Sequence, residues 1–283
     1  MTSPGHPSGL IPFPVPGSAL NSARGTYVVG QLIGDGQYGS VYECLGPFDQ
    51  PYALKMLRPA NKPYPVVRDE WATEMKRLES FRHPNIVYIH DAFEVNFLFY
   101  LALEKCDTSL RAMLDMGPLS PPLMVEVSRQ LLMTLSYLHD SGLVHSDLHA
   151  GNVLLSQVDR WPIVKLTDFG VAHQLDGATW FRPQVANPKI LTPELVTQGY
   201  TTRQSDLYQL GLLMYRMHTG RSPMPNEHGD LTAQIREGTP RALADSLGTP
   251  FAPVISKLLR RRDAYRYQNA REVWDDLRKC VWW

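Results

Sequence analysis

Two short stretches near the middle of the chain carry the side chains best suited to chemistry. One reads HSDLHAGN over residues 145–152 and leads into the apolar run VLL. The other is the apolar run VKLT over residues 164–167, which leads into DFG. The two runs predict a hairpin in which Asn152 precedes the first strand and Asp168 follows the second, so antiparallel pairing places both at one end. Two hard oxygen ligands side by side suit Mg²⁺, which completes its shell with phosphate and water. Asp147 lies in the same loop, where it can meet a hydroxyl nucleophile.

A glycine-rich stretch, GDGQYGSV over residues 34–41, follows the pattern G-x-G-x-x-G-x-V. A dinucleotide-binding fold needs a strand, the glycines and then a helix. Here the glycines lie between two predicted strands, YVVGQLI over 27–33 and SVYECL over 40–45. Glycines in a hairpin let backbone N–H groups approach a phosphate with no side chain in the way. The pattern therefore favours phosphate binding, and a simple turn is the alternative.

A lysine and a glutamate further along the chain predict an ion pair. Lys55 lies in the third predicted strand, PYALKML, where it either reaches water or meets an anion. Glu74 lies on a predicted helix over residues 68–81, at the edge of its apolar stripe, and a carboxylate that faces the core needs a cation. Glu70 and Glu79 point further out and are poorer partners. The stripe consists of Val67, Trp71, Met75 and Leu78.

The order of the predicted elements favours an α+β architecture with two lobes. The first third of the chain is rich in strands. Two long helices follow, over residues 123–142 and 205–220, each closed by a glycine, and a last helix covers 270–280. A cleft between two such lobes is the usual position of a site. Residues 1–25 are rich in Pro, Gly and Ser and predict a disordered tail, since each Pro removes a donor and blocks the turn before it.

Composition argues against several classes of protein. The 283 residues include 28 Lys and Arg and 28 Asp and Glu, so the net charge of zero gives no support for nucleic-acid binding. There is no run of about 18 uncharged apolar residues, so we expect no membrane span in this chain. The N-terminus lacks the pattern of a secretory signal. Three scattered cysteines without a CxxC pair suit a reducing cytoplasm.

Taken in order, the glycine stretch, the strand lysine, the helix glutamate, H-x-D-x-x-x-x-N and DFG resemble a protein kinase of the serine/threonine type, of the eukaryotic-like kind found in bacteria. The resemblance covers about Tyr27 to Leu277. It implies a kinase domain over residues 26–283. This domain would contain a small β-rich N-lobe with one helix over 26–104 and a larger helical C-lobe over 105–283.

Further matches support the same resemblance. TPE over residues 192–194, Asp206 and Arg266 are similar to positions that build a platform for a protein substrate. The resemblance implies that Glu194 pairs with Arg266 inside the larger lobe. It also implies that Asp206 accepts backbone N–H bonds from the catalytic loop, helped by the start of its helix.

The resemblance implies transfer of the γ-phosphoryl group of ATP to a Ser or Thr hydroxyl of a protein substrate, with Mg²⁺ bound. Asn152 and Asp168 would bind the metal, and Asp147 would take the hydroxyl proton. Lys55 would hold the phosphates, and His149 would stand where a lysine usually touches the transferring phosphate. The nucleotide would be bound by Ile33, Gly34, Asp35, Gly36, Gln37, Tyr38, Gly39, Ser40, Val41, Ala53, Lys55, Glu74, the gatekeeper Leu103, Glu104, Cys106 and Leu154.

Four departures from the family pattern bear on mechanism. Ser146 stands where an Arg usually precedes the catalytic Asp, which makes this a non-RD sequence and weakens the case for control by phosphorylation. His149 replaces a Lys, and it either supplies positive charge when protonated or packs in the loop. Asn187 replaces a Thr that helps to seat a Ser/Thr substrate, and Thr192 replaces an Ala. The preference for Ser/Thr over Tyr therefore stays open.

Two other functions are alternatives. A small-molecule phosphotransferase, similar to aminoglycoside or choline kinases, shares H-x-D-x-x-x-x-N but generally lacks the complete glycine stretch and the TPE, Asp206 and Arg266 set. A non-enzymatic ATP-binding scaffold would be expected to lose Lys55, Asp147 or Asp168, and all three are present. We expect a cytoplasmic protein, or the cytoplasmic kinase part of a longer one.

Overall fold

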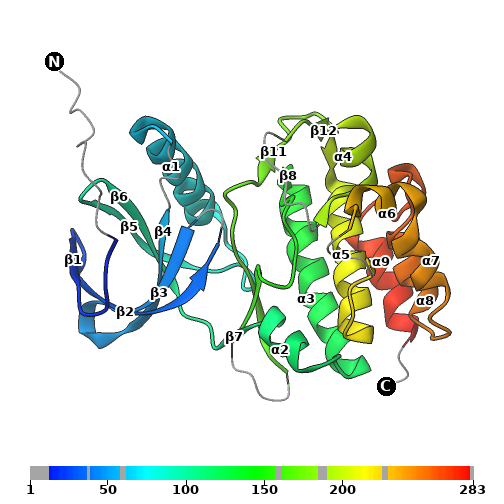
Figure 1. Ribbon diagram of the computed structural model, residues 1–283, viewed down its shortest axis with the longest axis horizontal. Helices are drawn as coiled ribbons and strands as arrows, with labels where there is room; N and C mark the ends of the chain where they lie inside the picture. Colours follow the sequence, from blue (N-terminus) through cyan, green and yellow to red (C-terminus); the bar gives the residue numbers. More distant parts are fainter. Residues whose placement is uncertain are drawn as a thin grey trace. The chain divides into compact units, whose positions relative to one another are not determined.

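The computed structural model describes residues 13–36, 39–57, 62–156, 161–183, 190–224 and 229–280. The chain forms two compact units (Figure 1). Unit 1 comprises Met1–Arg82 and Val87–Cys106, and unit 2 comprises His83–Ile86 and Asp107–Trp283. The lobe boundary predicted after residue 104 is therefore two residues early.

The short segment His83–Ile86 belongs to unit 2 because its backbone bonds to the hairpin there. The Leu166 N–H donates to the Asn85 carbonyl at 2.8 Å. Ile86 forms a parallel bridge with Leu166. The Asn85 side chain donates to the Val164 carbonyl at 2.9 Å. The sequence prediction placed this segment in the N-lobe, and these contacts correct it.

Unit 1 contains one antiparallel sheet and one long helix (Figure 1). The sheet has the strand order β1-β2-β3-β4-β6-β5. The helix α1 (Tyr64–Ser80) packs on β5 and β6, and the Trp71 indole donates to the Tyr100 carbonyl at 3.0 Å. The strands are β1 (Ala19–Ser22), β2 (Gly25–Asp35), β3 (Gly39–Leu45), β4 (Pro51–Leu57), β5 (Ile89–Val95) and β6 (Leu98–Glu104), with a 3₁₀ turn η1 (Pro47–Asp49).

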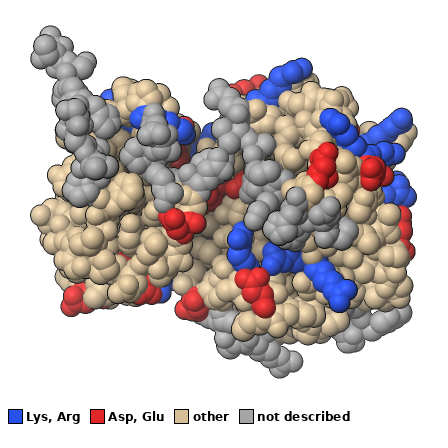
Figure 2. Space-filling model, in the orientation of Figure 1, with Lys and Arg blue, Asp and Glu red and all other residues tan. Residues whose placement is uncertain are grey.

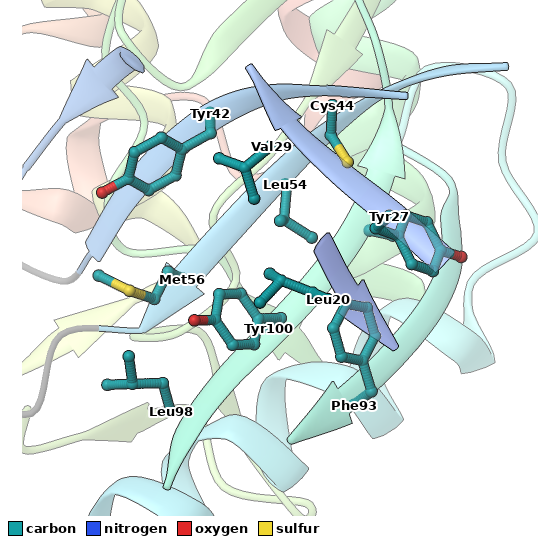
Figure 3. Close-up of a cluster of buried hydrophobic side chains, with 11 residues drawn as sticks. Leu20, Tyr27, Val29, Tyr42, Cys44, Leu54, Met56, Phe93, Leu98 and Tyr100 are labelled. Atoms are coloured by element: carbon teal, nitrogen blue, oxygen red, sulfur yellow. The ribbon is translucent and has the colours of Figure 1, made fainter. Parts of the chain in front are cut away.

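The two faces of this sheet carry different side chains, because successive side chains along a strand point to opposite faces. One face carries a buried apolar cluster (Figure 3). Ala53 and Lys55 alternate with the members of this cluster on β4, so they point to the other face. Val41 is the register partner of Lys55, and Leu103 is that of Ala53, so all four share that face. The cluster comprises Leu20, Tyr27, Val29, Tyr42, Cys44, Leu54, Met56, Phe93, Leu98, Tyr100 and Ala102.

The prediction of a tail over residues 1–25 is wrong for its second half. β1 pairs with β2 in an antiparallel ladder, in which Leu20 lies opposite Tyr27. Leu20 is buried in the apolar cluster, and the Ser22 hydroxyl donates to Asp91 at 2.6 Å. The prolines end at Pro16, so the backbone beyond it has the donors that a strand needs. Residues 1–12 lie outside the described residues.

Unit 2 is built mainly of helices, with short strands between them (Figure 1). The helices are α2 (Leu110–Met116), α3 (Pro121–Asp140), α4 (Pro193–Gln198), α5 (Arg203–Thr219), α6 (Leu231–Glu237), α7 (Thr239–Asp245), α8 (Ala252–Leu258) and α9 (Ala270–Leu277), with 3₁₀ turns η3 (Asp263–Tyr265) and η4 (Arg278–Cys280). The strands are β7 (Thr108–Ser109), β8 (Leu143–Val144), β9 (Val153–Ser156), β10 (Ile163–Leu166), β11 (His173–Gln174), β12 (Trp180–Phe181) and β13 (Thr201–Thr202).

Three helices of unit 2, α3, α5 and α9, match the predicted ones except near their ends, whereas α2, α4, α6, α7 and α8 were not predicted. α5 ends at Thr219, and Gly220 caps it with φ of 71°, a left-handed conformation that glycine adopts without strain. α3 ends at Asp140, two residues before Gly142. α9 ends at Leu277, and η4 continues to Cys280. Among the described residues, no helix is long and apolar enough to span a membrane.

The predicted ion pair between Glu194 and Arg266 is confirmed inside unit 2. Two Arg266 nitrogens donate to the two Glu194 carboxylate oxygens, at 3.0 and 2.6 Å. The Ser205 hydroxyl also donates to Glu194. The Arg266 guanidinium lies over the Tyr208 ring, 4.8 Å from its centroid. This pair joins the start of α4 to the segment before α9.

Candidate active site

The hairpin of β9 and β10 places Asn152 and Asp168 at one end, as predicted. Val153 is the register partner of Leu166. Beyond this pair, the Thr167 N–H donates to the Asn152 carbonyl at 3.0 Å, and Asp168 is the next residue. Asp168 has φ of 65°, which is uncommon for a residue other than glycine.

Asp147 and Asn152 are joined directly. The Asn152 side-chain amide donates to the Asp147 carbonyl and to Asp147 Oδ2, both at 2.9 Å. Asp147 is 3% exposed and Asn152 is 7% exposed. Because the Asn152 amide nitrogen donates its hydrogen bonds to Asp147, Oδ1 is the Asn152 side-chain atom that can bind a cation. One residue therefore orients the predicted base and offers an oxygen to the predicted metal.

The buried Asp206 carboxylate holds the start of the catalytic loop, as predicted. It accepts from the His145 N–H at 2.9 Å and from the Ser146 N–H at 2.8 Å. Ser146 has φ of 68°, so this carboxylate stabilises a left-handed turn. His139 Nε2 also donates to Asp206, at 2.8 Å. Sequence reasoning missed His139, whose only signal was a polar residue near the end of an apolar helix.

Gln209 is a second support that sequence reasoning missed. Its side-chain oxygen accepts from the Leu148 N–H at 3.0 Å. Its amide nitrogen donates to the Ser146 carbonyl at 3.0 Å and to the Ile190 carbonyl at 3.2 Å. Gln209 therefore ties the catalytic loop to the segment before α4. A glutamine on a nearly all-apolar helix was the available signal.

His145 links the two chemical stretches. Its Nδ1 accepts from the Asp147 N–H at 3.2 Å, and its Nε2 donates to the Thr167 carbonyl at 3.2 Å. Its ring packs edge-on against Phe169, with centroids 5.0 Å apart. Complete burial lowers the pKa of His145, so the ring is neutral and serves as a structural bridge.

His149 is held as a neutral acceptor within the loop. Its Nδ1 accepts from the Gly151 N–H at 3.0 Å and from the Asn152 N–H at 3.2 Å. The proton therefore lies on Nε2, which is 3.6 Å from Asp147 Oδ2. Burial, and next the positive charge of Arg111, lowers the pKa of His149 to about 4. Of the two predicted roles, this geometry favours packing in the loop over supply of positive charge.

In unit 1, the predicted pair of Lys55 and Glu74 is confirmed. Lys55 Nζ donates to Glu74 Oε1 at 2.7 Å. Lys55 is 7% exposed and Glu74 is 3% exposed. Glu70 instead pairs with Lys62 at the surface, also at 2.7 Å. The ion pair joins β4 to α1 and fixes the ammonium group on the face of the sheet that also carries Val41.

The glycines of the predicted phosphate loop fall into two kinds. A Cβ on Gly39 would lie 2.4 Å from the Met56 carbonyl oxygen, so the fold itself requires glycine there. Among the described residues, the atom nearest to a Cβ on Gly34 would be a Val41 side-chain carbon at 3.6 Å, and the atom nearest to a Cβ on Gly36 would be the Gly39 carbonyl oxygen at 3.8 Å. Packing against the described residues therefore does not require glycine at these two positions, whereas close approach of a phosphate would favour it. Gln37 and Tyr38 lie outside the described residues.

Most of the other predicted nucleotide-binding residues lie on the sheet of unit 1. Ala53 and Leu103 lie on the Lys55 face of the sheet, and Ile33 is half exposed on β2. The Glu104 N–H donates to the Tyr88 carbonyl at 2.9 Å, so this N–H is already used within the sheet. Asp35 accepts from the Ser40 hydroxyl at 2.8 Å, and Cys106 and Leu154 are partly exposed. Asn187 lies outside the described residues.

The oxygen ligands fit Mg²⁺ bound together with a phosphate. Among the described residues, no group of three or more His, Cys, Asp or Glu side chains could hold a metal by itself. Asn152 and Asp168 offer two oxygens at one end of a hairpin. Mg²⁺ is commonly bound by one or two protein ligands together with substrate phosphates and water. The donor set fits that arrangement.

Comparison with known proteins identifies the family of this chain. The model of the protein kinase domain matches residues 27–275. The chain is 30% identical over 270 residues to serine/threonine-protein kinase D2 of Homo sapiens, covering 88% of this chain and 30% of that protein. It is 28% identical over 265 residues to serine/threonine-protein kinase PrkC of Bacillus subtilis, covering 90% and 40%. The chain thus spans less than half the length of these relatives. The chain belongs to the protein kinase domain family.

Proposed function

We propose that this chain transfers the γ-phosphoryl group of ATP to a Ser or Thr hydroxyl of a protein. The observation that carries the proposal is the buried Asp147 carboxylate, which Asn152 orients at the end of the hairpin that presents Asp168. The names of the relatives, both serine/threonine-protein kinases, support the same reaction and acceptor.

The residues of unit 1 would bind the nucleotide. Lys55 would hold the phosphates, and Glu74 keeps its ammonium group in position. Because Gly34 and Gly36 carry no side chain, the phosphates could approach the backbone N–H groups of this stretch closely. The apolar side chains on the same face of the sheet as Lys55 would pack against the adenine ring.

The residues of unit 2 would perform the transfer. Asn152 Oδ1 and Asp168 would bind Mg²⁺, which together with ATP supplies the phosphoryl donor and neutralises its charge. Asp147 would accept the proton of the attacking hydroxyl. His149 Nε2 lies 3.6 Å from Asp147 Oδ2, so we assign it as a positioning residue that keeps the Asp147 carboxylate oriented.

The choice of a protein acceptor rests on unit 2. The pair of Glu194 and Arg266 fixes the segment that begins α4, and Gln209 fixes the backbone just before it. Such a platform suits a polypeptide substrate. The cytoplasmic location stays a prediction from the three scattered cysteines.

The test is a transfer assay with three classes of acceptor. The protein is incubated with labelled ATP and Mg²⁺ in the presence of basic proteins, casein-like proteins or small alcohols. We expect label on Ser or Thr of at least one protein, and no transfer when a chelator removes the metal. Label on small alcohols alone would identify a small-molecule phosphotransferase and contradict the proposal.

A further inference from the structure

A cavity in unit 2 lies directly beside the catalytic loop. Its volume is about 240 Å³. Most of its lining is apolar and comes from four segments. These are the catalytic loop at Leu148, the segment before α4 at Ile190, the buried helix α5 at Leu213 and the segment beyond α5 at Met224. All four side chains are buried, so the cavity is a formed feature of this unit.

Most of the polar side chains that line the cavity already form hydrogen bonds or ion pairs within the protein. Gln209 makes three hydrogen bonds to the backbone around it, and His149 Nδ1 accepts two. Arg216 pairs with Asp115 at 3.0 Å, at a rim where the two side chains are 33% and 61% exposed. Because these side chains are already bonded within the protein, they shape the cavity but offer few donors or acceptors to a bound molecule.

Arg111 is the exception. Its backbone N–H donates to the Ala150 carbonyl at 2.9 Å, which anchors the start of α2 on the catalytic loop. Arg111 is one of the residues that line the cavity, and it is exposed. Among the residues that the structure describes, no carboxylate pairs with its guanidinium. On this face of unit 2, Lys and Arg side chains lie beside Asp and Glu side chains (Figure 2).

This charge lies close to the reacting position. A Cβ placed on Gly151 would be 3.1 Å from an Arg111 guanidinium nitrogen and 3.1 Å from His149 Nδ1, so both side chains lie close to Gly151 of the catalytic loop. His149 in turn reaches to 3.6 Å from Asp147 Oδ2. An extended chain advances about 3.3 Å per residue. A residue one to three positions from an acceptor hydroxyl at Asp147 therefore reaches Arg111.

We propose that this cavity is a specificity pocket that selects an acidic residue, with an apolar neighbour, within three positions of the phosphoacceptor in a protein substrate. The inference rests on the proposed function and adds the chemistry of the substrate. The carboxylate pairs with Arg111, which presents a planar fork of donors. The apolar neighbour enters the cavity between α5 and the catalytic loop.

The test uses serine peptides that differ at one position, from three residues before the serine to three after it. Each position carries Glu, Gln or Lys, beside a fixed leucine. We expect kcat/KM for Glu to exceed that for Gln by about threefold or more at one position at least, as befits a partly exposed ion pair. The preference should weaken at high ionic strength because salt screens such pairs.

Variants of the chain assign the preference to one side chain. Arg111→Gln should bring the Glu-to-Gln ratio to about one, and Arg111→Glu should favour the Lys peptide. Arg216→Gln should change the ratio less, because Asp115 already compensates that charge. Arg271→Gln is the matched control. It makes the same charge change at an exposed position on α9 that does not line the cavity, and it should keep the wild-type ratio.

Two results separate this inference from the function on which it rests. Efficient transfer with equal kcat/KM for Glu and Gln at every position would overturn the inference and leave the kinase activity intact. A Glu preference that survives both Arg111→Gln and Arg111→Glu would overturn it as well. Absence of transfer to every peptide and protein would overturn the proposed function, and the specificity pocket with it.

Discussion

Lys55 Nζ lies 2.7 Å from Glu74 Oε1, and both side chains are almost completely buried. The pair therefore does two things at once. It holds the ammonium group on the face of the sheet that carries the proposed nucleotide residues, and it joins β4 to α1. A buried ion pair is costly to break from one side, because the other charge remains in a place of low dielectric constant.

The first prediction concerns this pair. Lys55→Met should abolish transfer and also destabilise the protein, by about 3 kcal/mol. The double variant Lys55→Met/Glu74→Gln also removes the buried Glu74 charge, so it should recover part of the stability and none of the activity. Thermal unfolding and the transfer assay measure the two effects separately. Lys62→Met, which breaks the exposed pair with Glu70, is the control and should change the unfolding free energy by less than about 1 kcal/mol.

The second prediction concerns pH and stability. Burial alone would raise the pKa of Glu194, but Arg266 and the Ser205 hydroxyl together hold it below its usual value of 4.5. Glu194 is therefore a carboxylate that stabilises the folded state above about pH 4.5, and this contribution is lost as pH falls below that value. Glu194→Gln should lower the unfolding free energy at pH 7, and the gap to wild type should narrow below pH 4.5. A gap that widens on acidification would show that the ionised carboxylate does not stabilise the fold.

The third prediction concerns His149. Its Nδ1 accepts two backbone N–H bonds, which a lysine cannot do. His149→Asn offers a neutral oxygen at a similar place and should retain more activity than His149→Lys at every pH. The pKa of about 4 keeps the wild-type His149 ring neutral between pH 6.5 and 8. Titration of His149 should therefore not change the wild-type kcat in this range, and His149→Lys should not alter the shape of the pH profile. If His149→Lys raised kcat near pH 8, the ring would be a substitute for the family's lysine charge instead.

The fourth prediction is that activity does not depend on phosphorylation of the segment after DFG. Between Gly170 and Thr192 the only hydroxyl side chain is Thr179, which is exposed. Ser146 stands where an arginine would pair with a phosphate, and a serine side chain carries no charge for that purpose. Thr179→Ala should stay within about tenfold of wild type after phosphatase treatment, which corresponds to about 1.4 kcal/mol in the barrier. A larger loss would show that a phosphate on Thr179 is required.

The sequence predicts the chemical residues well because each lies in an ordered set of short patterns. The glycine stretch, Lys55, Asp147 and Asp168 are fixed by local spacing, and strand pairing brings Asn152 to Asp168. The partner of Lys55 was also predictable, since only a carboxylate at the edge of an apolar stripe faces the core.

Supports that act across long separations were not predictable. His139 and Gln209 reach the catalytic loop from α3 and α5, and neither position carries a local signal of its partner. β1 was missed because the proline-rich composition before it extends close to its start. The Arg111 charge in the cavity depends on how α2 docks on Ala150, which no periodicity reveals.

The measurement that tests the central claim most directly is the turnover of Asp147→Asn. An asparagine keeps the shape of the side chain and can still accept from the Asn152 amide, so the fold and ATP affinity should persist. It cannot take a proton from a hydroxyl, so kcat for Ser or Thr phosphorylation should fall by about 100-fold or more. Near wild-type turnover in a correctly folded Asp147→Asn protein would contradict the assignment of Asp147 as the base.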